Sequence, residues 1–209
     1  MVEAAPDLLE KSLFERSKEF HRSNTEHYCF LDLETTGLDP FRADWITAAF
    51  IVTDINHLVI KKNIFTARPD RSSCWDEGAE KIHKIPRDVA DSYPARVDAL
   101  HSVLAFLSPY SSTSTRLVFH ANGGFDWNFL RCSFYKYDLA YDLYRHLNYK
   151  NLESTIDLSK RLKHEKNSLD YLCGKYGISL KHHDAESDVS ACMELHKIFT
   201  RKLGDQLFS

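Results

Sequence analysis

The sequence has no uninterrupted apolar segment near the roughly 18 residues that a membrane-spanning helix needs, so we expect no membrane partner. Its first twenty residues are charged throughout and lack the apolar core of a secretory signal peptide. Glycine and proline are scarce, at 7 and 6 residues out of 209, which excludes collagen-like and low-complexity chains. These absences together predict a soluble, intracellular protein.

The cysteines are few, odd in number and scattered, and no C-x-x-C pair occurs among them. That pattern argues against both a disulfide framework and a structural zinc site. It predicts free, mostly buried thiols in a reducing compartment such as the cytoplasm. The five residues are Cys29, Cys74, Cys132, Cys173 and Cys192.

An excess of positive charge is also missing. The chain has 27 basic and 30 acidic residues, for a net charge of −3, whereas proteins that coat nucleic acid through its phosphates are usually basic. A nucleic-acid partner would therefore be held over a short stretch in a local site. A cluster of carboxylates that awaits a divalent metal would lower the charge in the same way.

What is present is the composition of an ordinary globular domain, with 43% hydrophobic and 27% charged residues. Hydrophobic periodicity predicts strands over 28–31, 45–52, 58–65 and 117–120. It predicts helices over 77–85, 96–107, 125–134, 139–147, 154–162, 168–176 and 185–203. The order indicates an α/β fold with a sheet of mixed direction over 27–209. Residues 1–26 form an N-terminal extension with an amphipathic helix over 7–21, docked on the core or, alternatively, on a partner.

The first candidate site follows the first strand, at Asp32-Leu33-Glu34. Residues two apart in a strand face the same side, so the two carboxylates project together. An exposed strand end would explain the pair equally well if nothing else accompanied it. The residues that follow, Thr35, Thr36, Gly37 and Leu38, offer hydroxyls, a flexible backbone and one apolar side chain, all of which a terminal nucleotide could use.

Two further acidic signals occur at the starts of predicted helices. Asp126 ends the segment Asn122-Gly123-Gly124-Phe125-Asp126, where an acid could instead serve only to complement the helix dipole. In the segment His183-Asp184-Ala185-Glu186-Ser187-Asp188, Asp184 can cap the last helix, which places His183 in the preceding loop and Asp188 inside the helix. A histidine before a helix is also common as a plain surface residue.

Taken together, these residues fit the hydrolysis of a phosphodiester. The reaction needs an activated water, a clamp on the non-bridging oxygens and stabilisation of the departing 3′ oxygen, which two divalent ions about 4 Å apart can supply. Mg²⁺ prefers oxygen ligands and retains several waters, so a few carboxylates suffice. A neutral histidine, with an ordinary pKa of about 6.5, can take the proton of the attacking water.

The sequence resembles the DEDD (DnaQ-like, ribonuclease H-like) 3′→5′ exonuclease superfamily over about residues 27–203, and specifically its histidine branch. That branch includes the DNA polymerase III proofreading subunit, ribonuclease T and oligoribonuclease. The D-x-E-T-T-G-L motif matches residues 32–38, the N-x-x-F-D motif matches Asn122, Phe125 and Asp126, and the H-x-A-x-x-D motif matches His183, Ala185 and Asp188. The second motif usually begins with histidine directly before its asparagine, whereas here His120 is displaced by one place, so His120 is given no role. His182 is the second candidate for the base.

The resemblance implies a ribonuclease H-like mixed five-stranded sheet flanked by helices, with the N-terminal helix as an addition. It implies a two-metal exonuclease that releases nucleoside 5′-monophosphates with two Mg²⁺ ions, for which Mn²⁺ can substitute. Asp32, Glu34 and Asp188 would hold one metal, with Asp32 bridging to the second and Asp126 acting mainly through water. Thr36 and nearby backbone would meet the terminal 3′ hydroxyl, and Leu38 would wedge against the last base.

The expected substrate is a single-stranded 3′ end, with DNA preferred to RNA because residues 168–178 resemble polymerase-associated members; a DNA polymerase is a candidate partner. A local excess of basic residues before the third motif predicts a patch that tracks phosphates, although a solvated helical face is the alternative. Trp127 and Phe129 could stack on bases, but their helical spacing favours the core. The basic residues are Lys150, Lys160, Arg161, Lys163, Lys166, Lys175 and Lys181.

Two other functions remain open at this point. A catalytically weak nucleic-acid-binding or polymerase-associated scaffold could keep the same fold, but it would have little need of four carboxylates and a base. A metal-dependent phosphohydrolase of free nucleotides would share the metal ligands but would need no strand-binding patch.

Overall fold

The structure is a computed structural model and describes residues 24–181 and 183–207; the predicted helix over 7–21 and the second candidate base, His182, lie outside this part. The strands are β1 (His27–Thr35), β2 (Trp45–Asp54), β3 (Val59–Thr66), β4 (Thr115–Phe119) and β5 (Leu152–Ser154). The helices are α2 (Glu77–His83), α3 (Arg87–Asp91), α4 (Arg96–Leu107), α5 (Phe125–Lys136), α6 (Ala140–His146), α7 (Thr155–Arg161), α8 (Leu169–Tyr176) and α9 (Ala185–Leu207), with a 3₁₀ turn at Tyr149–Asn151.

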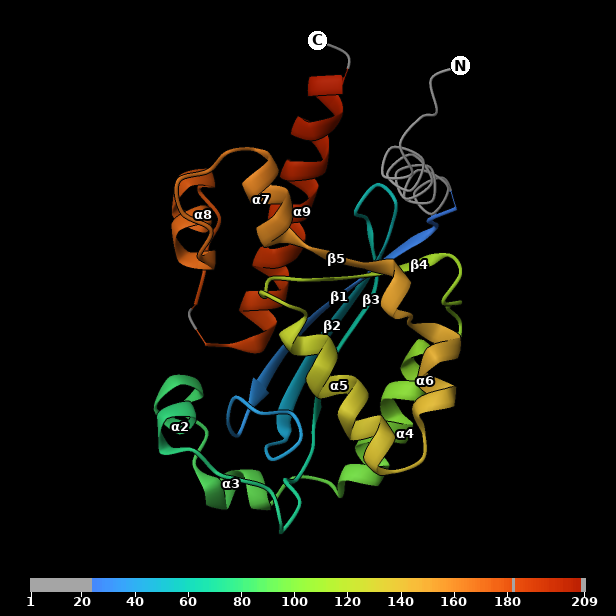
Figure 1. The fold of residues 1–209 in the computed structure, drawn as a ribbon, viewed down its shortest axis with the longest axis vertical. Helices are drawn as coiled ribbons and strands as arrows, with labels where there is room; N and C mark the ends of the chain where they lie inside the picture. The colour runs from blue at the N-terminus through green and yellow to red at the C-terminus, as the bar shows by residue number, and fades with distance from the viewer. Residues whose placement is uncertain (1–23, 182, 208–209) are drawn as a thin grey trace, which may run out of the picture.

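The strands form one five-stranded sheet in the order β3-β2-β1-β4-β5. β1 lies at its centre, antiparallel to β2 and parallel to β4. β2 is continuously buried from Trp45 to Thr53, as its apolar run predicted. The mixed sheet flanked by helices confirms the predicted fold class (Figure 1).

Alternate residues of β1 face two different helical layers, because side chains in a strand alternate between the two faces of the sheet. Cys29, Leu31 and Leu33 belong to the larger core cluster, which α4, α5 and α6 complete. Phe30 belongs to the opposite face, where it packs with residues of α9 such as Val189. The sheet is therefore covered on both sides, and its central strand is held between two layers.

Helices α7 and α8 extend the α9 layer (Figure 1). Leu158 of α7, Leu172 of α8 and Phe199 of α9 are fully or almost fully buried in a third cluster. The long helix α9 thus packs on the sheet near its beginning and on α7 and α8 further along. This packing fixes the direction in which its first turn, the part that carries Asp188, approaches the sheet.

Three short elements were not predicted from the sequence: α3, the 3₁₀ turn and the edge strand β5. All five cysteines are free thiols, as predicted, and only Cys74 is exposed. Within the described ranges, no helix combines the length and apolar character needed to cross a membrane.

Candidate active site

Asp32 and Glu34 lie where β1 continues past the end of β4, its parallel neighbour. Phe30 pairs with Val118, and β4 ends one residue later at Phe119. Asp32 and Glu34 therefore project from a part of β1 that only β2 still flanks, opposite Ala49 and Thr47. The early end of β4 leaves space beside the central strand in which other segments can approach the two carboxylates.

The first turn of α9 fills part of that space. Asp184 caps the helix as predicted, because its carboxylate accepts the backbone N–H of Ser187 at 3.1 Å. Asp188 follows one turn later and is buried. One carboxylate oxygen from each of Asp32, Glu34 and Asp188 lies within 4.8 Å of the others. Two segments from opposite parts of the sequence thus bring three acids to one point.

Asp126 reaches the same region from the start of α5. Gly123 and Gly124 both adopt the left-handed conformation (φ 62° and 71°), which glycine accommodates without strain and which turns the chain from β4 into the helix. Asp126 is only 5% exposed, and the backbone N–H groups of Asp126 itself and of Leu33 lie close enough to its carboxylate to favour the charged form. The carboxylate of Asp126 thus lies near Leu33, the residue between the two acids of the first motif.

Burial and mutual repulsion make these carboxylates hard to ionise. Burial, followed by the charges of Asp188, Asp126 and Asp184, raises the pKa of Glu34 to about 7. Burial likewise raises the pKa of Asp126 to about 7, although the two backbone hydrogen bonds oppose the shift. The pKa of Asp32 lies well above its usual range, because of burial first and then the three neighbouring acids.

A divalent cation is the group that this donor set fits. Among the described residues, no lysine or arginine forms an ion pair with Asp32, Glu34 or Asp126, so their repulsion has no cationic partner within that part of the chain. The donors are all carboxylate oxygens, the ligands that Mg²⁺ and Mn²⁺ prefer. Such a cluster suits a hard cation far better than zinc, for which nitrogen and sulfur ligands predominate.

The predicted base, His183, has left-handed backbone (φ 58°) directly before Asp184. His83, a residue that sequence reasoning missed, lies within electrostatic range of His183. His83 ends α2 and is only 6% exposed. Its Nδ1 accepts the N–H of Ile85 at 3.0 Å, which puts the proton on Nε2, and burial lowers its pKa. A lone histidine within an amphipathic helix gave no signal of this proximity.

The loop after β1 is held by an interlock between Thr36 and Asp44. The N–H of Thr36 donates to the carbonyl of Asp44 at 2.8 Å, and the N–H of Asp44 donates to the Thr36 hydroxyl at 3.0 Å. Thr36 is fully buried, so its side chain and its backbone both hold the loop in place. Thr35 donates to the carbonyl of Gly37 at 2.8 Å, whereas Leu38 is 81% exposed and projects from the loop.

Gly37 packs closely against its neighbours in this loop. A Cβ added there would lie 3.2 Å from the Cβ of Ala43 and 3.7 Å from that of Asp76. Asp76 begins the segment that leads into α2, and its N–H donates to the carbonyl of Thr36 at 2.8 Å. The residues 73–83 thus form a second wall beside the first motif, which the sequence did not indicate.

The remaining predicted site residues divide into surface and core. Asn122 is exposed in the loop before α5, and Phe125 is partly buried against Phe129, with ring centroids 4.8 Å apart. Trp127 and Phe129 are core residues, at 4% and 1% exposure. His120, to which no role was given, lies 2.7 Å from the Thr155 hydroxyl and connects β4 to α7. The seven basic residues predicted as a patch are all exposed; Lys150 lies in the 3₁₀ turn and the other six on α7, on α8 or in the loops that adjoin these helices.

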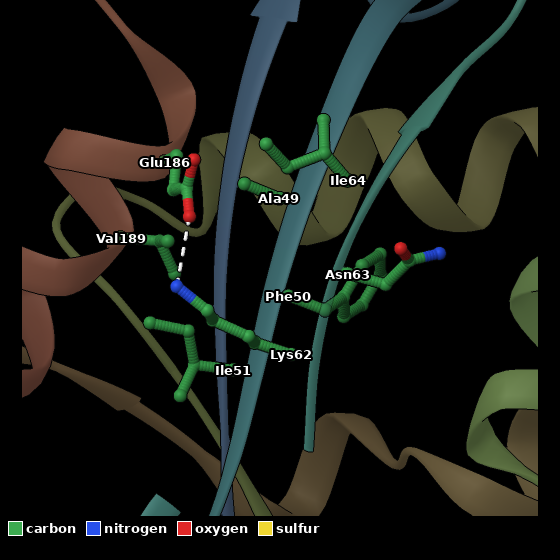
Figure 2. A pocket seen from close by; sticks show the side chains of 8 residues that line it. All are labelled: Ala49, Phe50, Ile51, Lys62, Asn63, Ile64, Glu186 and Val189. Atoms are coloured by element: carbon green, nitrogen blue, oxygen red, sulfur yellow. Dashed lines mark hydrogen bonds and ion pairs between the residues drawn. The ribbon is translucent and has the colours of Figure 1, made fainter.

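A cavity of about 260 Å³ lies beside the site, between the sheet edge and α9. Figure 2 shows Lys62 of β3 and Glu186 of α9 pointing toward each other across it, with Nζ and Oε1 2.9 Å apart. Glu186 is two residues from Asp188, so this ion pair attaches the edge strand to the turn that carries a site carboxylate. Both side chains are about half exposed, and such a pair contributes no more than about 1 kcal/mol.

Comparison with known families identifies the chain. The profile of the exonuclease family RNase_T matches residues 29–196, which include every predicted site carboxylate. The chain belongs to this exonuclease family. The predicted membership of the DEDD superfamily and the predicted enzyme class, a 3′→5′ exonuclease, are thereby confirmed. The family is dependent on divalent metal, in keeping with the acidic cluster.

Individual relatives agree with the family. The exonuclease is 28% identical over 179 residues to the DNA polymerase III subunit epsilon of Buchnera aphidicola subsp. Baizongia pistaciae, covering 81% of this chain and 68% of the relative. It is 26% identical to the same subunit from subsp. Schizaphis graminum, covering 85% and 76%.

Among solved structures, E. coli exonuclease I in complex with a dT13 oligonucleotide superposes with a TM-score of 0.75 at 22% identity. The match covers 88% of this chain but only 44% of exonuclease I, so the chain spans less than half the length of that enzyme. Exonuclease I from Methylocaldum szegediense superposes with a TM-score of 0.70 at 21% identity, covering 87% of this chain and 42% of that one. At these identities, both matches bear on the fold alone.

Proposed function

We propose that this exonuclease holds two Mg²⁺ ions, replaceable by Mn²⁺, through Asp32, Glu34, Asp126 and Asp188, and that His183 is its general base. One observation carries the proposal: three buried or partly buried carboxylates from β1 and α9 converge within 4.8 Å, and Asp126 lies close enough to raise the pKa of Asp32 and Glu34. Like charges are brought together in a protein interior at high cost unless a cation neutralises them.

Divalent ions held by these carboxylates would supply charge neutralisation, a clamp on the non-bridging phosphate oxygens and stabilisation of the departing 3′ oxygen. The attacking water gives its hydroxyl to phosphorus and its proton to His183. The bond between phosphorus and the 3′ oxygen breaks, that oxygen takes up a proton, and the products are a nucleoside 5′-monophosphate and a strand one residue shorter. His183 stands directly before the α9 cap, so the helix that supplies Asp188 also sets the position of the base.

The loop after β1 provides the contacts to the terminal nucleotide. Leu38 is 81% exposed beside the acids and wedges against the last base. The backbone next to Thr36 would meet the 3′ hydroxyl, while Thr36 itself keeps the loop in place through Asp44. Asn122 and Phe125, at the start of α5, border the other side of the terminal nucleotide.

The proposed substrate is a single-stranded 3′ end, with DNA ahead of RNA. Support comes from the two relatives, both DNA polymerase III epsilon subunits. The same relatives support a DNA polymerase as a partner of this chain. The exposed basic residues of α7 and α8 would follow the phosphates of the strand that leads away from the site.

The test compares the wild-type protein with Glu34→Gln, His183→Ala and Asp138→Asn on matched 5′-labelled single-stranded DNA and RNA, with Mg²⁺ or with EDTA. Asp138 is exposed and has left-handed backbone, which asparagine also tolerates, so it controls for the loss of one acid elsewhere. We expect a metal-dependent ladder from the 3′ end with the wild type and Asp138→Asn, and a loss of at least about 100-fold with the other two. Full activity of His183→Ala would exclude it as the base.

A phosphohydrolase of free nucleotides is the competing function for the same acids. The double change Lys160→Glu and Lys163→Glu separates the two, because only a strand-binding enzyme uses charges on α7 and the loop that follows it. We expect weaker binding of oligonucleotides and a shallower dependence on salt, with hydrolysis of a dinucleotide unchanged. An unaltered salt dependence would remove the support for a phosphate-tracking patch.

A further inference from the structure

A second cavity lies apart from the acidic cluster. Its lining contains more basic than acidic residues. It has a volume of about 480 Å³ and is bordered by α3, the start of α4, the segment after β3 and the end of α5. In Figure 1, α3 and the start of α4 lie beyond the carboxyl-terminal end of β1. Four arginines line it: Arg68, Arg71, Arg87 and Arg96.

The cavity has a rigid base. Arg96 is only 3% exposed, and its Nη2 donates to the carbonyls of Trp45 at 2.8 Å and Arg68 at 3.1 Å. Its charge is balanced by Asp44 at 3.7 Å and Asp70 at 3.9 Å. Arg96 therefore fixes the shape of the cavity floor and the backbone of Arg68, and it adds little net charge.

The positive charge that no acid balances comes from Arg68 and Arg71, which form the exposed rim of the cavity. The lining contains two acids, Asp91 and Asp70. A carboxylate oxygen of Asp91 lies 3.9 Å from Nε of Arg87, and Asp70 accepts a hydrogen bond from the Tyr137 hydroxyl at 2.7 Å. Within the described part of the chain, neither Arg68 nor Arg71 forms an ion pair. Both are exposed, so two guanidinium groups at this rim are available to an anion.

The start of α4 adds a third donor group. Ala95, Arg96 and Val97 line the cavity, and Ala95 has no side chain that could cap the helix. The start of a twelve-residue helix, with the positive end of its dipole, therefore borders the same cavity. Paired guanidinium groups together with a helix N-terminus form the donor arrangement that recognises phosphate.

We infer that this cavity is a second binding site, separate from the catalytic carboxylates, and that it binds the phosphate group of a nucleotide or a nucleic-acid strand. Arg68 and Arg71 bind the phosphate oxygens, the start of α4 completes the contact, and Arg96 holds the floor. A volume of about 480 Å³ is large enough for a whole nucleoside monophosphate. The inference does not depend on the catalytic proposal, because binding is measured without metal or hydrolysis.

The test is calorimetric titration of the full chain with inorganic phosphate and with a nucleoside 5′-monophosphate in EDTA, which keeps both probes from being bound through metal. The variant is Arg68→Gln with Arg71→Gln, and the control is Arg145→Gln with Arg201→Gln, which removes the same charge from two exposed arginines elsewhere. We expect saturable binding that weakens roughly tenfold or more in the arginine variant and is unchanged in the control. Equal binding by the two variants, or none by the wild type, would overturn the inference.

The two sources of phosphate are separated with a single-stranded oligonucleotide in EDTA. If the strand supplies the phosphate, the arginine variant binds the oligonucleotide more weakly, with a salt slope lower by about 0.7 for the lost contact. If the free nucleotide supplies it, only binding of the monophosphate is reduced. Either result supports the site, and a variant that binds phosphate, monophosphate and oligonucleotide like the wild type excludes it.

Discussion

Replacing Glu34 by glutamine should stabilise the metal-free protein at alkaline pH while it removes activity. Glu34 is 9% exposed, and burial together with the nearby acids raises its pKa from 4.5 to about 7. In the unfolded chain its pKa is ordinary, so above pH 7 the folded state alone bears the cost of the buried charge. A difference of about 2.5 pKa units corresponds to about 3 kcal/mol.

The expected gain is smaller than this figure, because the glutamine amide is also buried away from water. Half of it, roughly 1.5 kcal/mol, would raise the melting temperature of a chain of this size by about 3–6 °C. The pH dependence has a definite sign. The folded pKa is the higher one, so stability from the protonated acid is fully present below about pH 4.5 and is lost as the pH rises through 7.

The assay is thermal unfolding in EDTA at pH 5 and pH 8.5, for the wild type, Glu34→Gln and Glu165→Gln. Glu165 is exposed, so its variant controls for the loss of one surface charge. Glu34→Gln should melt higher than the wild type at pH 8.5 and nearly equal to it at pH 5, and Mg²⁺ should stabilise the wild type more. A variant that melts lower at pH 8.5, or by an equal margin at both pH values, would refute the reasoning.

Three further changes test other parts of the structure. Nε2 of His57 lies 2.7 Å from Nδ1 of His196. Burial, followed by the charge of His196, lowers the pKa of His57 to about 4, so between pH 6.5 and 4 the unfolded state binds more protons than the folded state. The free energy of unfolding should therefore fall as the pH is lowered from 6.5 to 4, and it should fall less in His57→Gln, as measured by urea unfolding at several pH values. Thr36→Val removes the hydroxyl that accepts the N–H of Asp44 and should lower the urea unfolding free energy by about 1–3 kcal/mol and reduce exonuclease activity. Phe129→Ala empties a site that is 1% exposed and should lower the unfolding free energy by about 3–5 kcal/mol, as measured by the shift in urea midpoint.

Much of the fold could be predicted because its main elements carry strong local patterns. The run from Trp45 to Val52 is apolar on both faces, as a strand covered on both sides must be, and the structure buries all of it. β5 could not be predicted, since its three residues are ordered by pairing with β4 and not by their own sequence. α3 is one short turn of helix whose position depends on its neighbours in the same way.

The site was predictable in part for the same reason. Asp32 and Glu34 share one side of a strand, a relation that spacing alone gives, and the structure keeps it. Asp188 comes close to these two carboxylates only because α9 packs across the sheet. Only the family motif indicated that the three acids lie together. The nearness of His83 to His183, and the buried group of Arg96 and Asp44, arise from tertiary contacts that leave no periodic trace in the sequence.

The origin of the site carboxylates in β1, α5 and α9 has a consequence for synthesis on the ribosome. A nascent chain that ends after α8 already contains Asp32, Glu34 and Asp126 but lacks Asp188, and with it the helix that covers one face of the central strand. Such an intermediate would contain three of the proposed metal ligands and would lack the fourth, Asp188. The emergence of α9 therefore supplies the last of the four proposed metal ligands, so the proposed site assembles only once α9 has packed on the sheet.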